Sequence, residues 1–186
     1  MNARFRVIAV CLALSSAAPA WATTYAPVSF DELVNTADVI FIGEVTDVRP
    51  YPVNTRDGTI INTRVVFRVV DPLWGTSSAL EAFDFFGGEW GGVAMGVADM
   101  PVFTSGERVV MFAHRARSIN PVVGFTQGLM QVGADVNGVE RVWTAGGMPL
   151  TRPEAIGTQI TVTPLLPMRL RDFRDRIATA LEGRRR

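Results

Sequence analysis

The chain has 186 residues, and 18 arginines balance 18 acidic residues, so the formal net charge is zero. This length suffices for one domain with a substantial core and leaves no room for a second full domain. The only cysteine is Cys11 and the only histidine is His114. These counts exclude a disulfide scaffold and the enzyme classes that hold a metal with several histidines or cysteines.

The amino terminus is typical of a cleavable secretory signal peptide. Arg4 and Arg6 precede an apolar run over residues 7–14, and the small residues that follow end in Ala20-Trp21-Ala22. Signal peptidase cuts after this pattern. We therefore expect residues 1–22 to be a signal peptide, cut after Ala22, and the mature protein to be periplasmic or secreted. The apolar run is far shorter than a membrane-spanning helix, so we expect no transmembrane anchor.

The mature chain opens with signals for a short helix and then a buried strand. Ser29 followed by Glu32 forms a capping box, which predicts one or two helical turns over residues 29–36. Residues 38–49 predict a strand. Its first half is apolar on both faces, as in a strand that passes through a core.

A second strand follows the turn residues Asp57-Gly58. Its apolar positions alternate with polar ones, which predicts one buried face and one wet face; the apolar positions are Ile61, Val65, Phe67 and Val69. Because proline cannot donate a hydrogen bond to a sheet, we expect Asp71-Pro72 to end this strand.

Further strands are predicted over residues 80–86 and 107–113, and residues 87–92 between them are expected to form a glycine-rich loop. The turn pair Asn137-Gly138 indicates a hairpin in which residues 129–136 and 139–143 pair across a two-residue turn. About six strands are expected in all.

The carboxyl end is helical in pattern. Beyond a proline-punctuated stretch, apolar residues recur at helical spacing and Gly183 is expected to stop the helix; these residues are Met168, Leu170, Phe173, Ile177 and Leu181. We place a β-barrel domain at residues 23–148. Residues 149–186 form the proline-punctuated segment and an amphipathic helix that packs on the barrel.

Short sequences in this order resemble the netrin-like module of tissue inhibitors of metalloproteinases, over about residues 30–115. They are the capped helix, a strand opening Ala37-Asp38-Val39-Ile40, a strand ending Leu73-Trp74-Gly75, and residues 106–112. The resemblance implies an OB-type barrel of five strands. From the resemblance together with the residue patterns, we predict a mostly β fold: an OB-type barrel of five or six strands, closed or partly open, with a short N-terminal helix and a C-terminal amphipathic helix. Those inhibitors chelate the protease zinc through an amino-terminal cysteine. Here the expected first residue is Thr23, so no inhibitory residue carries over.

Trp90 and Glu89 are the candidate partner-binding residues. A large aromatic side chain on an exposed glycine-rich loop lowers solubility and is the residue type that anchors protein interfaces. The alternative is that residues 87–92 are a plain surface connection. The loop lacks the Lys-Ser/Thr pair of a phosphate-binding loop.

Other polar residues form no catalytic or metal-binding pattern. The sequence contains no Gly-x-Ser-x-Gly motif whose serine His114 could activate as a nucleophile, and Ser105 merely precedes a turn glycine. The carboxylates of Glu89, Asp99 and Glu107 match no calcium-loop spacing. We therefore predict no catalytic residue, no metal and no cofactor.

The charge distribution bears on the class of partner. Residues 168–186 contain seven arginines against three acidic residues, which indicates a solvated helix face or, alternatively, contact with anionic lipid or an acidic partner. The rest of the mature chain is net acidic, which disfavours nucleic acid as a partner.

Two functions of different classes remain open at this stage. The first is a noncatalytic binding or modulating protein acting on another extracytoplasmic protein, with a metalloprotease as the partner that the resemblance implies. The second is a periplasmic small-ligand carrier or hydrolase that uses the mouth of the barrel. The scarcity of histidine and cysteine favours the first.

Overall fold

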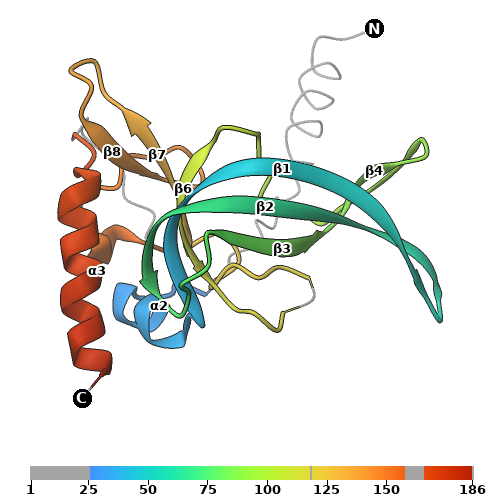
Figure 1. The fold of residues 1–186 in the computed structure, drawn as a ribbon, viewed down its shortest axis with the longest axis horizontal. Coiled ribbons are helices and arrows are strands. Elements are labelled where there is room, and N and C mark those ends of the chain that lie inside the picture. Colours follow the sequence, from blue (N-terminus) through green and yellow to red (C-terminus); the bar gives the residue numbers. More distant parts are fainter. Residues whose placement is uncertain (1–25, 118, 158–165, 186) are drawn as a thin grey trace, which may run out of the picture.

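The computed structural model describes residues 26–117, 119–157 and 166–185. The expected signal peptide and its cleavage site lie outside the described residues. The described chain is mostly β, as predicted. Its main sheet is antiparallel and runs in the order β3-β2-β1-β6-β7-β8 (Figure 1). These strands are β1 (Val39–Thr55), β2 (Gly58–Trp74), β3 (Leu80–Phe86), β6 (Arg108–Ala113), β7 (Leu129–Ala134) and β8 (Glu140–Thr144).

The smaller elements lie around this sheet. A separate two-stranded sheet pairs β4 (Gly88–Trp90) with β5 (Val93–Met95). The helices among the described residues are α2 (Phe30–Thr36) and α3 (Leu170–Arg184), and a 3-10 turn spans Pro153–Ala155. No helix among the described residues has the length and apolar character needed to span a membrane.

The main sheet has six strands and is not closed into a barrel. β3 and β8 are its two edge strands. The outer edge of β8 pairs instead with the segment that leads to α3. The Val142 amide donates to the Met168 carbonyl, and the Leu150 amide donates to the Val142 carbonyl, both at 3.1 Å. These bonds occupy positions that a closing strand would need.

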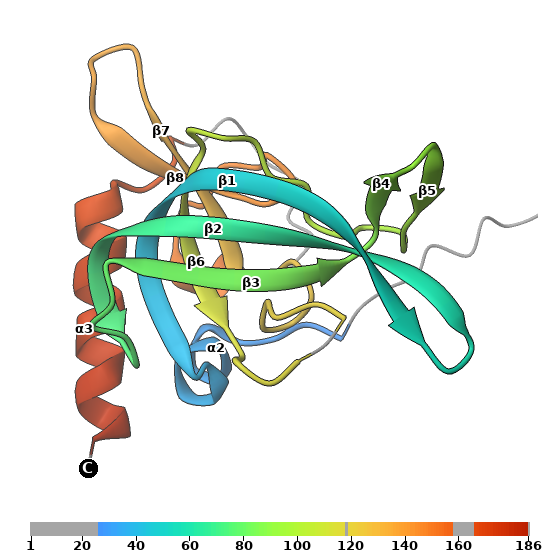
Figure 2. The same ribbon diagram turned by 45° about the vertical axis from the view of Figure 1, so that its right-hand side comes forward.

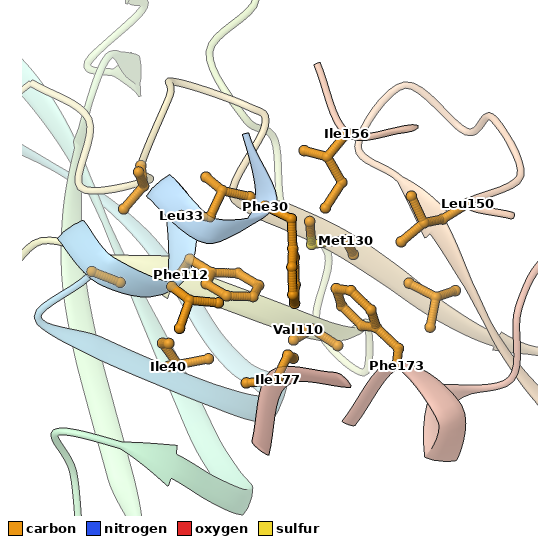
Figure 3. Close-up of a cluster of buried hydrophobic side chains, with 14 of the residues drawn as sticks. Phe30, Leu33, Ile40, Val110, Phe112, Met130, Leu150, Ile156, Phe173 and Ile177 are labelled. Atoms are coloured by element: carbon orange, nitrogen blue, oxygen red, sulfur yellow. The ribbon is translucent and has the colours of Figure 1, made fainter. Parts of the chain in front are cut away.

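The sheet is buried on both faces. Along β1, Val39, Phe41 and Val45 join a cluster on one face of the sheet. Ile40 and Ile42 join a second cluster on the other face, which α2 and α3 cover (Figure 3). This two-sided burial confirms the prediction that the first strand passes through a core.

The two helices form as their sequences predict. The Ser29 hydroxyl accepts a hydrogen bond from the Glu32 amide at 3.2 Å, which caps α2. α3 buries its four apolar residues against the sheet and α2; they are Leu170, Phe173, Ile177 and Leu181. The expected packing of the C-terminal helix is therefore confirmed.

Gly183 does not end α3, which continues to Arg184. The Arg184 guanidinium donates to the carbonyls of Val34 and Ala37 at 2.7 and 2.8 Å. It also lies 4.6 Å from the ring centre of Trp74. These contacts hold the last helical turn in place, and they outweigh the preference of glycine for a helix end.

β2 continues past Pro72 to Trp74, contrary to expectation. Pro72 pairs with Phe41, and the ladder shifts register on both sides of this pair, between Ile40 and Phe41 and between Ile42 and Gly43. β3 pairs only with residues 62–68 of β2. Proline is tolerated at such a position because the ladder is irregular and the strand has no neighbour on its other side.

The hairpin of β7 and β8 forms as predicted, but its loop is longer than two residues. The last strand pair is Ala134 with Glu140. The Asp135 carboxylate accepts hydrogen bonds from the amides of Asn137 and Val139 at 2.8 and 3.0 Å. Such an Asx turn satisfies the loop backbone locally and so removes the need for a tight two-residue turn.

β1 extends beyond β6 from residue 46, and β2 extends beyond β3 at residues 58–61; together they form an arm, residues 46–61, whose outer part is two-stranded (Figures 1 and 2). Pro50 pairs with Thr63 and Pro52 with Ile61. The Ile61 carbonyl accepts from the Gly87 amide, so this face of the β2 backbone turns away from β1. Pro50 and Pro52 therefore stand on the free edge of β1, where they remove donors that another strand would need.

Candidate partner-binding site

An apolar groove of about 390 Å³, the arm groove, lies between the base of the arm, the end of β3, the β4–β5 hairpin and residues 97–103. No ionisable residue lines it. Its main apolar contributors are Val48, Val65, Phe85, Met95, Met100 and Phe103. The Thr63 hydroxyl at its wall donates to the Gly87 carbonyl at 2.7 Å, so the bond is made within the protein. The groove can therefore accept apolar groups and offers no counter-charge to an ion.

The groove is the open end of the core on that face of the sheet. Val65, Phe85 and Phe103 belong to the buried cluster, and Val48 and Met100 pack against it. The ring of Phe103 lies 4.8 Å from that of Phe85, centre to centre. The floor of the groove is thus formed by side chains of the packed core.

The β4–β5 hairpin forms one side of the groove. Its two-residue turn, Gly91-Gly92, has positive φ angles of 59° and 79°, which suit glycine. Gly88 lies against the arm, since a Cβ there would come within 2.5 Å of Thr63 Oγ1 and 3.1 Å of Pro50 Cβ. Residues 87–92, expected to be a loop, are therefore largely a strand and its turn. A glycine at position 88 lets β4 approach the arm closely.

The pairing of the hairpin decides which side chains face the groove. Trp90 pairs with Val93 and Gly88 with Met95. Because paired residues share a face and neighbours along a strand alternate, Trp90, Val93 and Met95 lie on the face that meets the arm. Glu89 pairs with Ala94 and lies on the opposite face. The structure thus aligns Trp90 with the groove and directs Glu89 away from it.

Exposed apolar side chains continue the groove onto the surface. Trp90 is 50 % exposed and Val93 is 53 % exposed, while Val102 on the opposite rim is 87 % exposed. We call these three residues the apolar rim. Val102 lines the groove, and Trp90 and Val93 belong to the hairpin whose residues Gly88 and Met95 line it. The hairpin lies at the end of the molecule remote from α3 (Figure 2).

The other polar residues considered in the sequence analysis either form hydrogen bonds within the fold or lie exposed outside the groove. The Glu107 carboxylate accepts from the Thr104 amide at 3.1 Å and from Gln131 at 3.3 Å. Asp99 is exposed and Ser105 lies in the turn before β6. Within the described part of the chain, no group of three or more His, Cys, Asp or Glu residues is placed to hold a metal ion.

His114 follows the last residue of β6, and its Nδ1 lies 3.7 Å from an Asp38 oxygen. Burial, and then the charge of Arg117, lower the pKa of His114 despite the opposing effect of Asp38. Nearby, the buried Glu81 receives two hydrogen bonds from Arg115, at 2.9 and 3.0 Å. These groups join the ends of β3, β1 and β6, which is a structural role.

Many of the carboxyl-terminal arginines are engaged within the molecule. Arg174 pairs with Asp71 of β2. Arg176 pairs with Glu154 at 2.6 Å, and Arg184 caps α2 as described above. The basic face of α3 therefore helps to hold the helix on the sheet, in keeping with a docked, solvated helix face.

Sequence reasoning identified Trp90 but missed the groove beside it. Two walls carried a readable signal. Val48 and Pro50 alternate with polar residues, as Thr63 and Val65 do on the paired strand, so one apolar face extends along both. The wall at residues 97–103 has no strand or helix pattern, and only its packing in the fold reveals it. Comparisons of the chain with protein-family models, with curated proteins and with solved structures find no match.

Proposed function

We propose that this is an exported, noncatalytic binding or modulating protein that holds another extracytoplasmic protein through the arm groove and the apolar rim. The observation that carries the proposal is the apolar groove together with the half-exposed Trp90 and Val93 on the hairpin that forms one of its sides. Contiguous exposed apolar patches on water-soluble proteins mark interaction sites. A half-exposed indole next to an apolar groove is the kind of anchor that dominates interface energies.

The partner class and the location rest on the sequence. The amino-terminal pattern supports export, with Thr23 as the first mature residue. The resemblance to the netrin-like module supports an OB-type origin of the fold and a metalloprotease as partner. The two-sided core around β1 is compatible with that origin. Mass spectrometry of the protein recovered from cells tests the export step, because an uncut amino terminus contradicts it.

Trp90→Ala tests the binding surface. The indole is half exposed, so the melting temperature should change less than for the loss of a buried aromatic side chain. Partner capture should weaken at least about tenfold, which corresponds to 1.4 kcal/mol. Val136→Ala is the matched control, since Val136 is a fully exposed apolar residue in the β7–β8 loop.

The assay is photo-crosslinking in the producing cell. A photoreactive residue at position 93 should yield a discrete crosslinked protein, and Trp90→Ala in the same chain should abolish that product. A photoreactive residue at position 136 should not yield it. If position 93 gives no product, or Trp90→Ala leaves the product unchanged, the binding surface is assigned wrongly.

A small-ligand carrier is the second candidate. The volume of the groove lies within the range of small-molecule sites, about 300–1,000 Å³. Its lining without ionisable groups restricts such a ligand to an uncharged apolar molecule. Displacement of a fluorescent naphthylamine probe by apolar ligands, without effect of Trp90→Ala, would favour this candidate over protein binding.

A further inference from the structure

The size of the apolar surface points to an occupant larger than the groove. A small molecule that filled the groove would leave Trp90 and Val93 facing solvent, since both are at least half exposed and neither lines the groove. A polypeptide segment can fill the groove and cover these side chains at the same time. The prolines on the free edge of β1 disfavour strand addition there, so recognition depends on side chains.

The chain segments around the groove are net acidic. Residues 69–107 contain six acidic residues and no basic one, and the arm adds Asp47 and Asp57 against Arg49 and Arg56. Three of the six are neutralised by arginines from elsewhere in the chain, in the pairs Asp71–Arg174, Glu81–Arg115 and Asp84–Arg64.

The other three acidic residues are Glu89 on the hairpin, Asp99 in the segment that lines the groove, and Glu107. Glu89 and Asp99 are exposed, and neither forms an ion pair within the described residues. Asp99 thus lies in the segment that lines the groove, and Glu89 lies on the outer face of the hairpin beside it, so the surface around the uncharged groove carries negative charge that no ion pair among the described residues neutralises.

We propose that the occupant is a protein segment that places apolar side chains in the arm groove and carries arginine or lysine residues beside them. This inference rests on the proposed function and adds the chemistry of the partner. Rim charges of one sign steer and select a partner of the other sign, while the buried apolar anchor supplies most of the affinity. The same carboxylates repel an anionic lipid surface, which makes a membrane the less favourable occupant of this patch.

The experiment selects random dodecapeptides displayed on phage against the purified full chain. The selected peptides should combine apolar residues with an excess of arginine and lysine. Their dissociation constants, measured by fluorescence anisotropy, should rise at least about tenfold between about 50 and 300 mM NaCl. Vesicles containing phosphatidylglycerol serve as the lipid probe and should not compete with the peptides.

Two sets of variants separate the inference from the proposed function. Glu89→Gln with Asp99→Asn should weaken peptide binding at least about threefold, as expected for exposed charges. Glu182→Gln is the matched control, because Glu182 is an exposed carboxylate on the distant helix α3. Trp90→Ala should weaken the same peptides more strongly than either.

The outcomes are distinct. Peptides that need Trp90 but show no basic excess, no salt dependence and no effect of the carboxylate variants overturn the inference and leave the proposed function standing. Peptides that bind equally well to Trp90→Ala overturn both. Competition by anionic vesicles overturns the protein segment as the occupant.

Discussion

Phe173→Ala tests whether α3 is an integral part of the core. The Phe173 side chain has no exposed surface, and its ring lies 5.9 Å from that of Phe30 and 6.4 Å from that of Phe112, between ring centres. It thus links α3 to α2 and to β6 (Figure 3). Truncating a buried phenylalanine costs about 3–5 kcal/mol, because the transfer energy is lost and a cavity remains. The two aromatic pairs contribute about 0.5–1.5 kcal/mol each within that total.

The measurement is urea-induced unfolding followed by circular dichroism, with the free energy of unfolding compared between variants. Thr179→Ala is the control on the same helix, since Thr179 is exposed and its hydroxyl only returns to the Asp175 carbonyl. Its stability should stay the same or rise slightly, because alanine has the higher helix propensity. A loss below about 1 kcal/mol for Phe173→Ala would show that α3 is loosely attached and that the two-sided core is described wrongly.

Three further predictions follow from the local geometry. Gly88→Ala should destabilise the contact between the hairpin and the arm and weaken partner binding, because the new Cβ meets Thr63 Oγ1 and Pro50 Cβ in addition to the strain of a φ of 131°. Gly58→Ala, with a similar φ of 128° and no neighbour near its Cβ, should show the backbone strain alone, and equal effects of the two substitutions on thermal stability would refute the contact. Hydrogen bonding by Arg64, opposed by burial, lowers the pKa of Asp84, so this pair stabilises the fold above about pH 4 and ceases to do so as the pH falls further. Arg64→Gln should therefore lower the urea midpoint at about pH 7 and have a smaller effect at about pH 3, and a loss independent of pH would contradict this assignment. Burial and Arg117 lower the pKa of His114, so the unfolded chain binds the proton more readily and stability should fall below about pH 6.5; His114→Gln should flatten that fall, and an unchanged pH profile would show that another group is responsible.

The elements that local patterns determine could be predicted from the sequence. The capping pair Ser29 and Glu32 marked α2 because the hydroxyl and the amide are three residues apart, a distance that a single helical turn fixes. Alternation along β2 marked its buried face for the same reason, since strand geometry alone sets the period.

Features that depend on distant partners were not predictable in this way. Gly183 predicts a helix end from the local sequence. The helix continues because the Arg184 side chain donates to the carbonyls of Val34 and Ala37, about 150 residues away in the chain. The sheet does not close into a barrel, and the segment around Leu150 and Met168 forms hydrogen bonds with the outer edge of β8. Neither contact leaves a trace in the local sequence.

The candidate site lies between these cases. Trp90 could be found from the sequence because a large aromatic residue in a glycine-rich segment is unusual whichever strand pairing the segment adopts. Glu89 could not be placed without the pairing of Glu89 with Ala94. The Gly91-Gly92 pair was a hairpin signal in its own right, and its use as such would have given the alternation of faces directly.

The register of the hairpin ties the site to the fold. β3 ends at Phe86, and Gly87 and Gly88 have positive φ angles of 103° and 131°, which carry the chain out of the main sheet. The contact of Gly88 with the arm then fixes which face of β4 meets the groove, and Trp90, two residues later, must lie on that face. One residue more or fewer between Gly88 and Trp90 would direct the indole away from the groove and bring the carboxylate of Glu89 toward it. The fold therefore presents Trp90 to a partner through the same glycine contact that anchors the hairpin.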